Sequence, residues 1–185
     1  MVENCIEIFE NAIKFETERL ILRKATLEDA SDLLEYGTDE KTLKFITWEG
    51  HRHINQAIEG IKRFYSNPGA FVIELKAENK VIGAIDIRPV WEHEKASFGY
   101  GLASKYWGRG YMSEAFGALV EFCFTELELN RVEAIHFVGN EASGRVMEKC
   151  GLLKEGVGLQ SSKVKGKFVD EVFYGAIMEN WLKSR

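Results

Sequence analysis

The stretch "YWGRGYMSEAF", Tyr106 to Phe116, decides the fold of this chain. Gly108 and Gly110 stand two residues apart, with Arg109 between them, directly before a segment whose apolar residues recur at helical spacing. A glycine loop at a helix N-terminus directs unpaired backbone N–H groups and the positive end of the helix dipole at one point, which suits a phosphate group. An ordinary strand-to-helix turn is the alternative interpretation of the same residues.

The two common nucleotide-binding motifs do not fit this loop. A dinucleotide fingerprint needs a third glycine where Ser113 stands and an acidic residue at the end of the next strand, and the sequence has neither. A P-loop needs Gly-Lys followed by Ser or Thr, which this stretch also lacks. If the loop binds phosphate, it therefore belongs to another kind of site.

The composition indicates one compact enzyme domain, residues 1–185, with residues 1–16 as an N-terminal extension. The chain is 45% hydrophobic and 29% charged, which is typical of a globular protein. Its net charge of −5 provides no general basic surface, so we expect no nucleic-acid partner. Acidic residues interrupt the apolar N-terminal stretch, so we expect neither a secretory signal nor a membrane partner. Three cysteines without a C-x-x-C pair favour a reducing cytoplasm over a disulfide framework.

The order of strand and helix patterns predicts an α+β fold. Apolar runs between turn residues predict strands at 19–25, 70–75, 80–90, 95–103 and 131–138, and two long strands within 152–178. Apolar residues at helical spacing predict helices at 26–37, 55–67, 112–127 and 140–151. The glycine loop therefore connects a strand to the helix 112–127.

Four segments in the right order carry a resemblance to a known family: "ERLILRKAT", "FGYGLASKYWGRGYMSEA", "LNRVEAIHFVGNEASGRVMEKCGLLKEG" and "DEVFYGAIMENW". The chain resembles the GNAT superfamily of acetyl-CoA-dependent N-acyltransferases over about residues 17 to 182. The segments look most like the branch that acetylates the N-termini of ribosomal proteins. The resemblance implies acetyl-CoA as co-substrate and a mixed central sheet of about seven strands with about four helices.

The family's loop reads Gln/Arg-x-x-Gly-x-Gly/Ala, and it aligns with Trp107, Gly108, Arg109, Gly110, Tyr111 and Met112. Trp107 replaces the Gln or Arg and Met112 replaces the small residue, so we expect backbone N–H groups to hold the pyrophosphate of acetyl-CoA. The resemblance assigns Asn140 to the pantetheine arm, although a helix N-cap would explain the same asparagine. It also implies that a backbone N–H near Leu102 or Ala103 binds the thioester oxygen.

The general base has no clear position in the sequence. In the resembling branch a glutamate often stands at the place of Ser97. The remaining candidates are Glu92, Glu94 and Asp86, each acting through water, and each also explained as a solvated surface acid. We take Glu94 as the candidate base. A weak base suffices for an α-amino group, whose pKa of about 7.7–8.0 leaves it partly neutral near pH 7.

The acid that protonates the leaving thiolate is expected to be Ser143. Many family members use a tyrosine where this chain has Met147, and Ser143 matches a serine that the branch places near the cofactor sulfur. A polar residue in the first turn of a helix is the alternative explanation. By the same analogy, we expect Trp48 and Glu49 to line the acceptor pocket, although one buried tryptophan in a polar loop would look the same.

The residues and the resemblance together predict an N-acetyltransferase that moves acetyl from acetyl-CoA to a primary amine, with a protein N-terminal α-amino group of ribosomal-protein type as the favoured acceptor. A small amine such as a polyamine or an aminoglycoside is one alternative, and a non-catalytic module that binds acyl-CoA is another. The four histidines lack ligand spacing, so we expect no metal. Both a monomer and a homodimer remain open.

Overall fold

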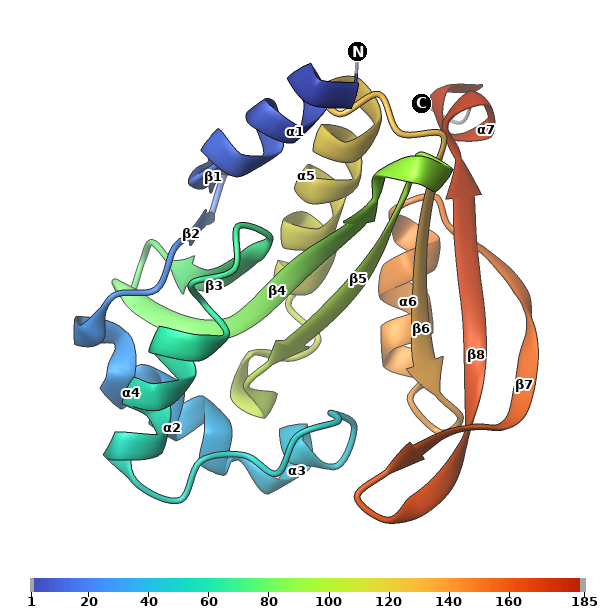
Figure 1. The fold of residues 1–185 in the computed structure, drawn as a ribbon. Helices are drawn as coiled ribbons and strands as arrows, with labels where there is room; N and C mark the ends of the chain where they lie inside the picture. Colours follow the sequence, from blue (N-terminus) through green and yellow to red (C-terminus); the bar gives the residue numbers. More distant parts are fainter. Residues whose placement is uncertain (1, 184–185) are drawn as a thin grey trace.

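The computed structural model describes residues 2–183, in which eight strands form one mixed sheet (Figure 1). The strand order is β1-β2-β3-β4-β5-β6-β8-β7, and every neighbouring pair is antiparallel except β5 and β6. The strands are β1 (Lys14–Glu16), β2 (Leu20–Arg23), β3 (Ala70–Leu75), β4 (Lys80–Val90), β5 (Lys95–Leu102), β6 (Arg131–Phe137), β7 (Leu153–Val164) and β8 (Lys167–Ile177). The α+β prediction is confirmed.

Helices cover both faces of the sheet (Figure 1). Those on one face include α5 and α6, and α2 and α4 lie on the other. The α-helices are α1 (Val2–Asn11), α2 (Ala30–Thr38), α3 (Glu40–Leu43), α4 (Ile54–Arg63), α5 (Tyr111–Thr125), α6 (Glu141–Lys149) and α7 (Met178–Lys183). Short 3-10 turns occupy Leu27–Asp29, Trp91–His93 and Ser104–Tyr106. Along residues 2–183 we find no helix with both the length and the apolar character that a bilayer crossing needs.

The element counts exceed the expected seven strands and four helices, because short elements were missed. Residues 1–16, expected as an extension, contain the ten-residue helix α1 and the three-residue edge strand β1. Cys5 and Phe9 are one helical turn apart and both are buried, and the Phe9 ring meets the Trp91 ring edge-on at 5.7 Å. The other two additions, α3 and α7, have four and six residues. Such short helices are stabilised by packing more than by local sequence.

The sheet opens between β5 and β6, and this opening positions the site. Their parallel pairing runs from Lys95 with Arg131 to Phe98 with Ala134, whereas β5 continues to Leu102. Figure 1 shows the two strands separating beyond their paired ends. Backbone N–H and C=O groups of β5 that face β6 therefore lose their ladder partners at this point.

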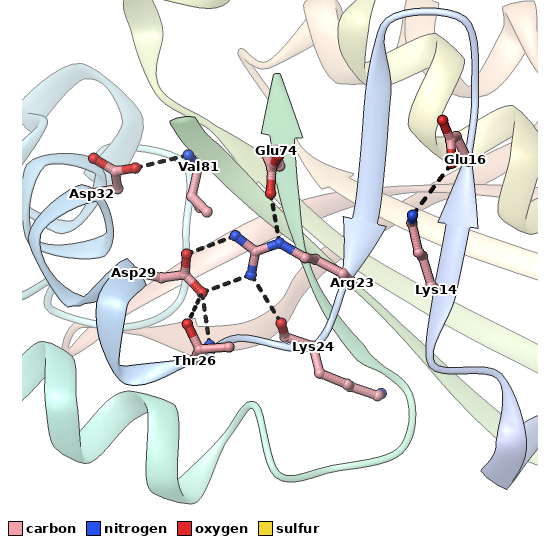
Figure 2. A network of polar contacts seen from close by, with 9 residues as sticks. All are labelled: Lys14, Glu16, Arg23, Lys24, Thr26, Asp29, Asp32, Glu74 and Val81. Carbon is pink, nitrogen blue, oxygen red and sulfur yellow. Dashed lines mark hydrogen bonds and ion pairs between the residues drawn. The ribbon is translucent and has the colours of Figure 1, made fainter. Parts of the chain in front are cut away.

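A partly buried ion network joins the start of α2 to β2 and β3 (Figure 2). The two terminal nitrogens of Arg23 each lie 2.8 Å from an oxygen of Asp29, and Arg23 Nε lies 2.6 Å from Glu74 Oε2. Asp29 also accepts the Thr26 backbone N–H at 2.7 Å. Burial alone would raise the pKa of Asp29, but these hydrogen bonds outweigh it and lower the pKa. The network thereby fixes the first helix after β2 on the sheet.

Candidate active site

A cavity of about 230 Å³ lies at the open end of β5, between the N-termini of α5 and α6 and the chain after α3. Eight of the ten residues expected to contact acetyl-CoA line it: Leu102, Trp107, Gly108, Gly110, Tyr111, Met112, Asn140 and Ser143. Ala103 and Arg109 are not among the lining residues. The structure thus brings the separate motifs of the sequence to one hollow, while their binding roles stay predictions.

The glycine loop takes a conformation that suits glycine. Gly108 and Gly110 have φ angles of +75° and +81°, in the left-handed region where a side chain is strained. Gly110 is the N-cap of α5, and its carbonyl accepts the Glu114 N–H at 3.0 Å. The first N–H groups of α5, which have no partner within the helix, therefore start at the wall of the cavity.

Arg19, which sequence reasoning placed only at the start of a strand, holds this loop in place. Its Nη1 donates to the Arg109 carbonyl at 3.0 Å, and its Nε lies 2.6 Å from Glu114 Oε2. The Arg19 guanidinium also stacks over the Tyr111 ring, 4.6 Å from the centroid. Because Arg19 and Glu114 are 95 positions apart, no local pattern reveals this pair.

Two further cations were missed by the sequence analysis. Arg145 and Lys149 lie one turn apart on α6, and both line the cavity. Helical residues four positions apart share a face, so both reach the same hollow. Together with the free N–H groups of α5, they suit a phosphate-bearing molecule.

The backbone at Leu102 is held from two sides. Its carbonyl accepts the Trp107 indole N–H at 2.6 Å and the Thr42 hydroxyl at 3.0 Å. Because the Trp107 donor is used in this way, the residue that replaces the family's Gln or Arg holds the loop to the strand instead of offering a side-chain donor to a ligand.

Of the two amides expected to meet a thioester oxygen, the structure excludes Ala103. The Ala103 N–H donates to the Ile82 carbonyl at 2.9 Å, so it is already used. Successive N–H groups of a strand point to opposite neighbours, so the Leu102 N–H points away from β4. It lies beyond Phe98, the last β5 residue paired with β6, and therefore faces the opening of the sheet.

Ser143 and Asn140 lie together at the start of α6. The Ser143 hydroxyl is 2.8 Å from the Tyr100 hydroxyl, and both residues line the cavity. Burial raises the pKa of Tyr100, so it remains protonated and able to donate. Asn140 occupies the N-cap position of α6 but its side chain makes no cap hydrogen bond. Capping of α6 therefore does not explain the side-chain amide of Asn140. The position of this amide at the cavity suits contact with a ligand.

Comparisons with known proteins agree with this geometry. The family model "Acetyltransferase (GNAT) domain" matches residues 19–153. The chain belongs to the GNAT family. It is similar to the uncharacterized N-acetyltransferase p20 of Bacillus licheniformis, 31% identical over 89% of this chain and 96% of the relative. A [Ribosomal protein uS5]-alanine N-acetyltransferase of Escherichia coli is 25% identical, with 94% and 95% covered. A GNAT-family acetyltransferase structure from Bacillus anthracis superposes with a TM-score of 0.82 at 28% identity, covering 90% and 99%.

GNAT membership confirms the family resemblance, the predicted fold and the predicted enzyme class. The protein is an acetyl-CoA-dependent N-acetyltransferase with a mixed eight-stranded GNAT sheet. The GNAT fold binds acetyl-CoA, and the cavity with its amides and cations fits a phosphate-bearing acyl donor. Over residues 2–183, no three His, Cys, Asp or Glu side chains gather in a group that could hold a metal ion.

The structure does not bring Glu94 into this GNAT site. Glu94 is exposed in the turn before β5, whereas Leu102 is the last residue of that strand. Eight residues of extended chain separate the two by about 25 Å. Glu92 is exposed in the same turn. The choice of Glu94 as base therefore does not fit the geometry.

Trp48 and Glu49 lie beside the GNAT cavity and do not line it. They border a separate open hollow near α4, together with His51. The Trp48 ring packs against His51 at 4.7 Å and against Tyr36 at 6.1 Å between centroids, and Glu49 is exposed. The hydroxyl of Tyr36 in turn lies against Gly101, which lines the cavity. Trp48 is therefore separated from the cavity by one aromatic ring.

Proposed function

We propose that this GNAT enzyme acetylates the α-amino group at the N-terminus of a protein, of ribosomal-protein type. The observation that carries this proposal is the similarity to the [Ribosomal protein uS5]-alanine N-acetyltransferase of Escherichia coli, which extends over 94% of this chain and 95% of that relative. At 25% identity the match supports a class of acceptor and does not select one protein.

The chemistry of the acceptor supports the same choice. Only a neutral amine can attack a thioester carbon. With pKa values of about 7.7–8.0 for an α-amino group and about 10.4 for lysine, the neutral fraction at pH 7.5 is roughly 200-fold larger for the α-amino group. An enzyme without a glutamate at Ser97 therefore gains more from an N-terminal acceptor.

The shape of the acceptor side also favours a thin chain end. The Lys165 ammonium in the β7–β8 turn donates to the Leu43 carbonyl at the end of α3, at 2.6 Å. Figure 1 shows this turn and α3 at the same end of the molecule. The cavity is lined from this direction by Thr42, Phe45 and Ile46. A contact between the turn and α3, next to Thr42 of this lining, suits an extended N-terminus better than a lysine on a folded surface.

Within this proposal, each part of the cavity has one task. The amides at the start of α5, with Arg145 and Lys149, hold the phosphates of acetyl-CoA. The Leu102 N–H stabilises the oxyanion as the amine attacks the thioester carbon. The C–S bond then breaks, and the Ser143 hydroxyl, hydrogen-bonded to Tyr100, gives a proton to the departing thiolate.

A panel of acceptors tests the proposal. The panel contains peptides with a free N-terminal Ala or Ser, the same peptides blocked at the N-terminus and carrying a lysine, a polyamine and an aminoglycoside. Each amine is incubated with acetyl-CoA and the released CoA thiol is measured. We expect kcat/KM for the free N-terminus to exceed that for the blocked peptide by at least 10-fold. A preference for lysine, polyamine or aminoglycoside would replace the proposed acceptor with that class.

Two further expectations remain proposals. Phe9 from the N-terminal helix and Trp181 from the C-terminal helix belong to one hydrophobic cluster, which supports residues 1–185 as a single domain. Cys5, Cys123 and Cys150 are free thiols, which supports a cytoplasmic location.

A further inference from the structure

A carboxylate, Asp86, lies on the strand next to β5, on the face of the sheet that packs against Tyr36 of α2. Asp86 of β4 pairs with Gly99 of β5, and Arg88 pairs with Ser97. Directly paired residues of an antiparallel sheet present their side chains on the same face. Asp86 therefore lies on the face of Ser97, two residue pairs closer to the cavity end of the strand.

Gly99 leaves the space that this carboxylate occupies. A Cβ added at Gly99 would lie 2.6 Å from Asp86 Oδ1 and 2.7 Å from an Arg88 nitrogen. Atoms at that distance collide, so any side chain at Gly99 would displace the ion pair. The Asp86 carboxylate thus lies over the backbone of β5 itself.

The next glycine on this face, Gly101, lies between the position of Asp86 and the cavity. Gly101 lines the cavity, and a Cβ there would collide with the Tyr36 hydroxyl. Residues two apart on a strand are separated by about 6.7 Å, so the Asp86 carboxylate and the Tyr36 hydroxyl lie over neighbouring steps of the same strand. A spacing of about 6.7 Å along the strand equals the reach of one or two hydrogen-bonded water molecules.

The surroundings of Asp86 make it a stronger base than an exposed aspartate. Its side chain is 17% exposed, and burial raises its pKa, while Arg88, with Nε 2.8 Å from Asp86 Oδ2, lowers the pKa by less. The other titratable groups that face it are Tyr36 from α2 and Tyr65 from the end of α4. Burial, followed by the negative charges nearby, raises the pKa of both tyrosines, so both stay neutral.

We propose that Asp86 is the proton acceptor for the attacking amine, in place of the glutamate that the branch carries at Ser97. The amine nitrogen forms its bond to the thioester carbon, and the proton it loses passes through water to the Asp86 carboxylate. The electron pair of the broken C–S bond leaves on the CoA sulfur. This step rests on N-acetyl transfer and not on the identity of the amine, so it stands whichever acceptor the panel selects.

The test compares Asp86→Asn with Glu94→Gln, using the acceptor of highest turnover in the panel. We expect Asp86→Asn to lower kcat roughly 10²-fold while KM for acetyl-CoA stays within twofold, and the acidic break in the pH profile of kcat to disappear. Glu94→Gln keeps the profile of the parent protein. Calorimetry with acetyl-CoA verifies that the Asn variant is folded.

A second variant tests the same assignment without removing the carboxylate. Arg88→Gln deletes the neighbouring positive charge, which raises the pKa of Asp86 further, so the acidic break in kcat moves to higher pH. An Asp86→Asn protein with the parent kcat and profile would overturn the proposal. So would an Arg88→Gln protein whose break does not move, or a Glu94→Gln protein that loses the break.

Discussion

Replacing Gly110 by alanine separates the fold of the glycine loop from its role in binding. At φ +81° an alanine is strained by about 1–2 kcal/mol, and the added Cβ has only Arg19 nearby, at 3.4 Å. A loss of this size in a protein of this length lowers Tm by about 2–8 °C. Binding is affected separately. If the loop relaxes and one amide hydrogen bond to a phosphate is lost, the free energy of acetyl-CoA binding weakens by about 1.5–3 kcal/mol, which lowers the affinity roughly 10- to 100-fold.

Gly166 offers a matched control in the β7–β8 turn. Its φ is +79° and a Cβ there has nothing within 4 Å, so Gly166→Ala carries the same backbone strain at a position that does not line the cavity. Thermal melts should show similar decreases in Tm for both variants, and calorimetry should show weaker acetyl-CoA binding only for Gly110→Ala. If Gly110→Ala binds acetyl-CoA as tightly as Gly166→Ala does, the amides of this loop do not hold the pyrophosphate.

Three other predictions follow from the contacts around the site and the core. Ser143→Ala should lower kcat by roughly 10²-fold with little change in KM for acetyl-CoA, and Tyr100→Phe by less, in steady-state kinetics; full kcat in Ser143→Ala would assign the proton to another donor. Arg19→Met should raise KM for acetyl-CoA by roughly 3- to 10-fold, because the Arg109 carbonyl and Glu114 lose their partner; an unchanged KM would mean that the loop holds itself. Arg23→Met should lower the free energy of unfolding by about 2–3 kcal/mol, less than the ~3–5 kcal/mol of a fully buried pair because Arg23 is partly exposed. Folding lowers the pKa of Asp29, so the stabilisation from its ionised form is complete above the unfolded pKa of about 3.9. This stabilisation is lost as the pH falls through the folded pKa. Urea titrations should therefore show a smaller decrease in stability below pH 4 for the Arg23 variant than for the parent protein.

The sequence predicted the elements around the glycine loop well because they are long and strongly periodic. The strand expected at 95–103 and the helix expected at 112–127 agree with β5 and α5 to within two residues. The Arg19–Glu114 pair was beyond such reasoning, since it depends on how β2 and α5 pack after folding. So was the burial of α1, whose apolar face is recognisable only once its partner Trp91 is placed.

The choice of Glu94 shows a different failure, which strand geometry alone would have corrected. The sequence analysis already placed a strand over 95–103 with the loop at its far end. A strand of that length spans about 25 Å, so a residue before it cannot act at its end. The pairing of Asp86 with Gly99 could not be predicted in the same way. The register of β4 and β5 depends on the turn between them, Trp91–Glu94, whose geometry the sequence does not give.

In the proposed reaction, the backbone of Leu102 joins the glycine loop to the α3 segment. Its carbonyl accepts hydrogen bonds from Trp107 of the glycine loop and from Thr42 of α3. The next N–H groups are also fixed, since Ala103 donates to Ile82 and Ser104 donates to the Asp39 carboxylate that caps α3. A donor so constrained needs little reorganisation when charge develops on the thioester oxygen, which is the condition for strong stabilisation of an oxyanion. Because Thr42 and Asp39 both belong to the α3 segment, movement of that segment on acceptor binding would be transmitted to the Leu102 N–H through two hydrogen bonds.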